Sequence, residues 1–269
     1  MSQTDAALLL PAVAAAAREA GALAMGWFRR GEKTSARVWT KDGDSPVTEA
    51  DVAIDEMLSQ RLGALGAHIG WLSEEAERHP ESGSDAPAWI VDPIDGTRGY
   101  ISGADLWAVS IALVQAGRPQ LGCLYLPALD RLLTASAGNG VACNGAPLAL
   151  TEAAPRIAAG PRPVLDKFMA HVEGFSVHPK IPSLAARIAA VAERQIAIAI
   201  ASDGAREWDV AAADLIVEEA GGRLTDLHGK PVRYDATPRR HGVLIASCEP
   251  DHDSLAQSLG AALANSARP

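Results

Sequence analysis

The first apolar patterns along the chain have the spacing of helices. Small apolar residues dominate residues 4–30, which predicts a long helix that is bent or restarted near Pro11 and ends before Gly31. Such a helix is expected to cover a sheet. A second helix is predicted after Thr48, which stands three residues before Asp51 as in a capping box. Its apolar residues recur at helical intervals: Ile54, Met57, Leu58 and Leu62.

Short apolar runs bounded by turn residues predict strands. In the first half these runs are 69–72, 88–91, 107–116, 120–126 and 131–135, with turns at 117–119, 138–140 and 144–145. In the second half the pattern predicts helices at 183–192, 208–220 and 251–263, and strands at 195–201, 223–225 and 243–246. Helices interleaved with a block of consecutive strands indicate an α+β layered fold rather than a regular βαβ winding.

Length and composition favour one unit with a large core. The chain has 269 residues, of which 48% are hydrophobic. Because residues 151–163 are rich in Ala and Pro, we expect approximate subdomains at 1–150 and 164–269 inside a single unit spanning 1–269. There is no internal repeat.

The charge and the cysteines limit the classes of partner and compartment. A formal net charge of −9 argues against binding a nucleic acid polymer or an anionic membrane. If so acidic a chain handles phosphate, a bound divalent cation is the most direct way to neutralise its carboxylates. Three widely spaced cysteines suggest neither a disulfide framework nor a thiolate metal site, so a reducing, cytoplasmic setting fits best.

The N-terminal apolar stretch does not have the pattern of an export signal. Residues 6–17 have no basic residue before them, contain Pro11 and lead directly into Arg18 and Glu19. No run reaches the roughly 20 uncharged apolar residues of a membrane span.

The most informative segment is W-I-V-D-P-I-D-G-T, residues 89–97. An apolar strand ends at Asp92, and a turn stiffened by proline carries Asp95, Gly96 and Thr97. Two carboxylates three residues apart can face one point, while the amides of Gly96 and Thr97 can point at an anion. Hard oxygen ligands of this kind suit Mg²⁺, although an arbitrary D-x-x-D more often only caps a turn.

The full string resembles the metal-binding motif of the inositol monophosphatase superfamily. Three further segments resemble motifs of that family in the expected order: K-D-G-D-S-P-V-T-E-A-D (41–51), W-L-S-E-E (71–75) and W-D-V-A-A-A-D-L-I-V-E-E-A-G-G (208–222). The resemblance covers nearly the whole chain. It implies a layered α/β/α/β/α sugar-phosphatase fold and a magnesium-dependent phosphomonoesterase.

The resemblance also implies a set of metal ligands. Glu74, Asp92 and the carbonyl of Ile94 are expected to hold one Mg²⁺, and Asp92, Asp95 and Asp209 a second. Some family members bind a third, weaker ion through Glu74 and water. The family pattern gives the metal contact to Glu74 rather than Glu75. Without the surrounding motif, Asp209 would be interpreted only as an acidic residue in the first turn of a helix, where the helix dipole favours it.

The resemblance assigns the catalytic roles to Asp51, Thr97 and Glu74. Thr97, hydrogen-bonded to Asp51, is expected to orient and help deprotonate the attacking water beside the ion that Glu74 holds. Asp51 also has a simpler reading, because it is the acidic partner of Thr48 in the capping box. The sequence offers no supported Ser, Cys or His nucleophile.

The substrate is a small anionic phosphorylated metabolite whose identity the metal core barely specifies. Arg98 resembles the nucleotidase and histidinol-phosphatase branches of the family, and the segment His178–Arg187 resembles bacterial nucleotidase-like members. Gly96 and Thr97 are expected at the phosphate, Lys180 at a second phosphate, and Ser183 as the cap of the helix beside it. Lys180 and Arg187 can equally be solvated surface charges. In inositol-specific members an acidic residue contacts the sugar hydroxyls, and this chain has Ser202 at that position. The adjacent Asp203 is expected to take over this contact after a small shift of the backbone.

These observations order the candidate functions. A 3'(2'),5'-bisphosphate nucleotide such as 3'-phosphoadenosine 5'-phosphate comes first, then an inositol monophosphate, then histidinol phosphate. A different class of function is a regulatory protein that keeps the fold and acts through a partner, but the intact acidic set argues for catalysis. The family also allows a homodimer. No H-E-x-x-H, Walker A or G-x-G-x-x-G motif supports a zinc hydrolase, kinase or NAD enzyme.

Overall fold

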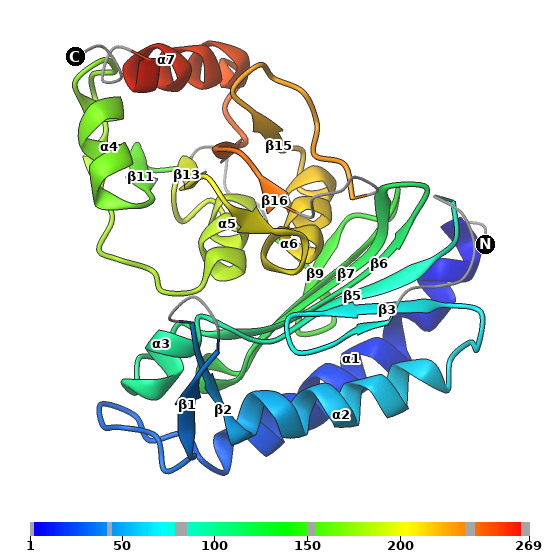
Figure 1. Cartoon of the computed structure of the whole chain (residues 1–269). Coiled ribbons are helices and arrows are strands. Elements are labelled where there is room, and N and C mark those ends of the chain that lie inside the picture. Colours follow the sequence, from blue (N-terminus) through cyan, green and yellow to red (C-terminus); the bar gives the residue numbers. More distant parts are fainter. Residues whose placement is uncertain (1–2, 42–44, 79–84, 150–153, 235–239, 265–269) are drawn as a thin grey trace.

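The computed structural model describes residues 3–41, 45–78, 85–149, 154–234 and 240–264 (Figure 1). The helices are α1 (Gln3–Met25), α2 (Glu49–Gly63), α3 (Thr97–Ile101), α4 (Arg162–Met169), α5 (Leu184–Ala192), α6 (Glu207–Glu219) and α7 (His252–Ala264), with a 3-10 turn η1 (Pro127–Leu129).

The larger sheet of the described chain has eight strands and is mostly antiparallel. Its order is β10 (Ala146–Pro147), β9 (Val141–Cys143), β8 (Arg131–Ser136), β7 (Arg118–Leu126), β6 (Ala108–Gln115), β5 (Ala88–Asp95), β3 (Gly70–Ser73) and β4 (Glu77–Arg78). Strands β3 and β5 pair in parallel, so their carboxyl ends lie at the same edge of the sheet.

The second sheet has five strands and lies in the second half of the chain. Its order is β12 (Ser176–Val177), β11 (Ile157–Ala159), β13 (Ile198–Ala201), β17 (Leu244–Ser247) and β15 (Arg223–Asp226). Two small hairpin-like pairs complete the described strands: β1 (Val38–Thr40) with β2 (Pro46–Thr48), and β14 (Ala205–Arg206) with β16 (Arg240–His241).

The elements form five layers, as the family resemblance implies (Figure 1). Along β5, Trp89 and Val91 pack with α1 and α2, whereas Ile90 faces the opposite side with α5 and α6. Beyond α5 and α6 lies the five-stranded sheet, and Ile198 and Ile200 pack on its far face with α4 and α7. The order is therefore helices, large sheet, helices, small sheet, helices, which confirms the predicted α/β/α/β/α arrangement.

Helix α1 departs from its prediction in two ways. It continues through Pro11 instead of restarting there, and it ends at Met25 rather than Arg30. Pro11 is exposed, and the neighbouring buried face, with Val13, Ala17 and Ala20, holds the helix on the sheet. Residues 6–25 are long and apolar enough to cross a membrane by length and composition, and a third of this stretch is buried inside the protein.

The segment expected to divide the two halves contains structure of its own. Strand β11 lies inside residues 151–163, and α4 begins there at Arg162. Because β11 consists of Ile157, Ala158 and Ala159, nothing in its sequence distinguishes it from the Ala- and Pro-rich residues around it. The first residues of that segment, 151–153, lie outside the described residues.

Candidate active site

The acidic motif forms the corner between β5 and α3. Strand β5 ends with an irregular register between Asp92 and Asp95, because Pro93 cannot donate a hydrogen bond to the ladder. Gly96 then adopts a φ of 89°, and α3 starts at Thr97. A residue with a Cβ at position 96 would be strained and would lie 3.0 Å from the backbone of Ser183. Glycine therefore lets the start of α5 approach the corner.

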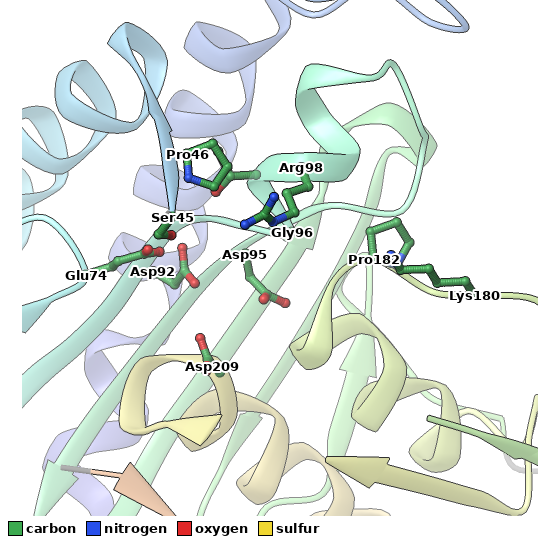
Figure 2. A pocket seen from close by; sticks show the side chains of 11 residues that line it. Ser45, Pro46, Glu74, Asp92, Asp95, Gly96, Arg98, Lys180, Pro182 and Asp209 are labelled. Atoms are coloured by element: carbon green, nitrogen blue, oxygen red, sulfur yellow. The ribbon is translucent and has the colours of Figure 1, made fainter. Parts of the chain in front are cut away.

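Four carboxylates from three separate parts of the chain line one cavity of about 220 Å³ beside this corner. Oxygens of Asp92, Asp95 and Asp209 lie within 4.8 Å of one another. Glu74 follows the last residue of β3 and lines the same cavity, close to Ser45 (Figure 2). The parallel pairing of β3 with β5 explains this convergence, and α6 contributes Asp209 from its first turn, across from the sheet.

The carboxylates raise one another's pKa values in the absence of a cation. Burial raises the pKa of Glu74 to about 8 and that of Asp209 to about 7, and neighbouring carboxylates add to both shifts. Burial, followed by the charges of Glu74 and Asp95, raises the pKa of Asp92 well above its usual range. Because the cluster offers only hard oxygen ligands at short mutual distances, its chemistry fits a divalent cation such as Mg²⁺.

Asp51 makes both of the contacts expected of it, one in the capping box of α2 and one with Thr97. Its Oδ2 accepts hydrogen bonds from the Thr48 amide at 2.7 Å and the Thr48 hydroxyl at 2.6 Å, which completes the capping box of α2. Its Oδ1 lies 3.5 Å from the Thr97 hydroxyl, which also lies 3.0 Å from the carbonyl oxygen of Ile94. Burial raises the pKa of Asp51 to about 6, so it remains ionised near neutral pH.

Ser183 lies beside Asp95 rather than in the cavity lining. Its hydroxyl, fully buried, donates to Asp95 Oδ2 and accepts from the Ala186 amide at 2.9 Å, as the N-cap of α5. The amide of Ala185 donates to the same Asp95 oxygen at 2.7 Å. The predicted role of Ser183 as the cap of this helix is therefore confirmed. Ser183 does not line either cavity among the described residues, because its hydroxyl holds Asp95 at the start of α5.

A second, larger cavity of about 500 Å³ adjoins the acidic one. Lys180 and Pro182 line both cavities, and Arg162, His178 and Arg187 add basic groups to the second. Within the described structure, the Arg187 Nε is buried and has no hydrogen-bond partner, while Nη1 donates to the Ile200 carbonyl at 3.2 Å. The combined site is therefore acidic at one end and basic at the other.

The remaining expected substrate residues differ in their placement. Arg98 lines the acidic cavity, and Figure 2 shows its side chain beside Gly96. Asp203 and its neighbour Ser202 are exposed, and neither is among the described residues that line the two cavities. The structure therefore does not bring Asp203 to the cavities in this conformation, and its contact with substrate stays a prediction.

Several residues of the site carried no individual signal in the sequence. Lys41 forms a 2.5 Å ion pair with Glu75 and lies 3.4 Å from the carbonyl oxygen of Glu74. This pairing explains why Glu75 is not available to the cavity. Residues 42–44 of the same motif lie outside the described residues. Arg187 could have been noticed only as the cation that ends the His178–Arg187 segment.

The sequence is similar to known proteins over most of its length. The model of the inositol monophosphatase family matches residues 5–266. A histidinol-phosphatase from Chlorobaculum parvum is 32% identical over 94% of this chain and 95% of its own length. A 3'(2'),5'-bisphosphate nucleotidase CysQ from Aggregatibacter actinomycetemcomitans is 31% identical over 84% and 87%. An inositol-1-monophosphatase from Mesorhizobium japonicum is 31% identical over 74% and 79%.

Solved structures share the fold of this chain. The crystal structure of the extragenic suppressor protein suhB from Bartonella henselae superposes with a TM-score of 0.79 at 28% identity, over 94% of this chain and 98% of that one. The family model thus matches almost the entire sequence, and the architecture is shared with a solved relative. The chain belongs to the inositol monophosphatase family of phosphomonoester hydrolases.

Proposed function

We propose that this enzyme is a magnesium-dependent phosphatase of a 3'(2'),5'-bisphosphate nucleotide, such as 3'-phosphoadenosine 5'-phosphate, in the cytoplasm. The observation that carries the proposal is the pairing of an acidic cavity with a basic one through Lys180 and Pro182. A bisphosphate nucleotide brings one phosphate to the acidic end, through cations, and a second to the basic end. The nucleoside then lies between the two ends.

The acidic end is assigned to the metal ions. Glu74, Asp92 and the Ile94 carbonyl would hold one Mg²⁺, and Asp92, Asp95 and Asp209 a second. When bound, the ions supply positive charge to the phosphoryl oxygens and make a coordinated water more acidic. The protein's own contribution is to keep these oxygen ligands together in a partly buried cavity, where their mutual repulsion favours cation binding.

Thr97 and Asp51 are assigned to the attacking water. The Thr97 hydroxyl can accept a hydrogen bond from that water, because its own proton faces Asp51 Oδ1 or the Ile94 carbonyl. The carboxylate of Asp51 is ionised at neutral pH and buried, so it can draw proton density through Thr97. Gly96 and Thr97 provide the first amides of α3, which helix geometry leaves for an anion.

The basic end distinguishes the candidate substrates. An inositol monophosphate leaves a neutral polyol, which gains little from Arg162, Lys180 and Arg187. Histidinol carries a protonated amine, which these cations repel. A second phosphate, by contrast, can accept a hydrogen bond from the buried Arg187 Nε, which has no partner among the described residues. Asp95 and Asp209 act on Arg187 through their charges, but neither forms a direct ion pair with it among the described residues. The similarity to a 3'(2'),5'-bisphosphate nucleotidase supports the same choice of substrate.

A phosphate-release panel at fixed Mg²⁺ tests the proposal. The substrates are 3'-phosphoadenosine 5'-phosphate, inositol 1-phosphate, histidinol phosphate and fructose 1,6-bisphosphate. We expect the nucleotide to have the highest kcat/KM, by about tenfold or more. Lys180→Gln should lower kcat/KM for the nucleotide but not for inositol 1-phosphate, whereas Lys167→Gln, at an exposed position on α4, should change neither. A higher kcat/KM for histidinol phosphate would overturn the substrate assignment.

A further inference from the structure

The turn that carries Glu74 is held by a residue on another element. Ser73, the last residue of β3, donates its hydroxyl hydrogen to Asp55 Oδ1 on α2. The same hydroxyl oxygen accepts the amides of Glu75 at 3.0 Å and Ala76 at 3.1 Å. The Ser73 amide closes the turn by donating to the Ala76 carbonyl at 2.9 Å. One hydroxyl therefore organises the backbone on both sides of Glu74.

The anchor for this hydroxyl is buried. Asp55 is 7% exposed and Ser73 is 3% exposed, so water competes little for the bond between them. A buried carboxylate that accepts a hydroxyl is a stronger partner than a neutral acceptor. Because Ser73 must donate to Asp55, its lone pairs remain oriented toward the amides of the turn. Asp55 thus fixes the orientation of Ser73, and Ser73 fixes the turn.

Helix α2 connects this turn to the other half of the site. Asp51 and Asp55 are four residues apart and lie on the same face of the helix. Asp51 reaches Thr97, and Asp55 reaches the Glu74 turn through Ser73. A single rigid helix therefore sets the separation between the Asp51–Thr97 pair and Glu74. Neither Asp55 nor Ser73 lines the acidic cavity among its described residues.

We propose that Asp55 is a positioning residue that, through Ser73, holds Glu74 in the orientation needed for metal binding. This inference rests on the proposed function, in which Glu74 is a ligand. In this role Asp55 acts only through Ser73 and contacts neither substrate nor ion. A hydrogen-bonded group behind a metal ligand commonly changes metal affinity by about 10- to 100-fold when it is removed.

Metal binding tests the role directly. Binding of Mn²⁺, measured by electron paramagnetic resonance, gives Kd values independent of turnover, and thermal unfolding gives Tm for the same samples. Asp55→Ala and Ser73→Ala should each raise the Kd of the Glu74-dependent site by about tenfold or more. Asp55→Asn should keep most of the affinity, because the amide oxygen can still accept the Ser73 hydroxyl. If Asp55→Ala folds poorly, Ser73→Ala tests the same positioning role without removing the buried carboxylate.

A control separates positioning from general stability. Leu58→Ala removes a fully buried side chain from the same helix that belongs to the apolar cluster under α1 and forms no hydrogen bond with Ser73, so it should lower Tm with little change in Kd. Glu74→Gln is the reference that removes the ligand. If Glu74→Gln left Mn²⁺ binding intact, the ligand assignment itself would fail. A different result would overturn only the positioning role. In that case Glu74→Gln would weaken Mn²⁺ binding, but Asp55→Ala and Ser73→Ala would weaken it no more than Leu58→Ala does.

Discussion

At the scale of single residues, three carboxylates of the site accept hydrogen bonds at the start of a helix. Asp51 caps α2, Asp95 accepts hydrogen bonds at the start of α5, and Asp209 accepts the Arg206 amide at 2.7 Å at the start of α6. Each therefore stabilises a helix end, and Asp95 and Asp209 also line the acidic cavity. These bonds fix the carboxylates before any cation arrives, so little reorganisation is needed on binding.

The raised pKa of Glu74 predicts how pH affects the metal-free enzyme. Its pKa rises from 4.5 to about 8 on folding, so the folded state binds an extra proton between these values. The contribution of this proton to the free energy of unfolding is therefore fully present at low pH and is lost as pH rises through about 8. Tm of the metal-free protein should fall between pH 6 and pH 8.5, and the rise in Tm caused by Mg²⁺ should grow over the same interval.

Differential scanning fluorimetry with and without Mg²⁺ measures both effects. Glu74→Gln stays neutral, so it should reduce both the fall in Tm and the Mg²⁺ response. Glu173→Gln makes the same chemical change at an exposed position and should reproduce the parent protein. The same fall in Tm for Glu74→Gln as for the parent would contradict the assignment of this proton to Glu74.

At the scale of elements, the sequence predicted what strong local patterns determine. The helix after Thr48 and the strands β3, β5, β6, β7 and β8 of the large sheet followed from a cap and from apolar runs, whereas the short strands β4, β9 and β10 were missed. The convergence of Glu74 with Asp92 and Asp95 was implied by the family resemblance of the motifs. Strand β11 was missed because its three residues are stabilised by pairing with β12 and β13 and not by a pattern of their own. The contact of Ser183 with Asp95 spans 88 residues, and no local pattern records it.

The junction of β5 with α5 yields a prediction that separates capping from catalysis. Ser183→Ala removes both the N-cap of α5 and the hydroxyl donor to Asp95. It should lower the free energy of unfolding by about 1 kcal/mol. Ser183→Gly also loses the hydroxyl, but glycine is tolerated at an N-cap and should cost only a few tenths of a kcal/mol.

Activity should follow the hydroxyl and not the cap. Urea unfolding reports the stability of each variant, and phosphate release reports turnover. Both variants should lose activity to a similar extent, because both leave Asp95 without the Ser183 donor. A turnover loss in Ser183→Ala that Ser183→Gly does not share would show instead that helix stability matters, and not the orientation of Asp95.

At the scale of the whole molecule, the acidic cavity lies between the end of β5 in the large sheet and the start of α6 in the middle helix layer (Figure 2). The large sheet supplies Asp92 and Asp95, and the middle layer supplies Asp209 on α6 and holds Asp95 through the start of α5. The basic residues Lys180 and Arg187 come from the same second half of the chain. Neither half contains the complete site.

The middle layer also predicts that the proposed subdomains, 1–150 and 164–269, unfold together. Residues of α6 such as Val210, Ala212 and Leu215 share one buried cluster with Ala112 and Leu124 of the large sheet. Separating the halves would expose this cluster, so partial unfolding is disfavoured. Five of the six tryptophans lie before residue 108 and report the first half, whereas helical far-UV circular dichroism includes α4 to α7. The two signals should therefore give one common urea transition. Two separated midpoints would show that the halves fold independently and that α5 and α6 belong energetically to the second half alone.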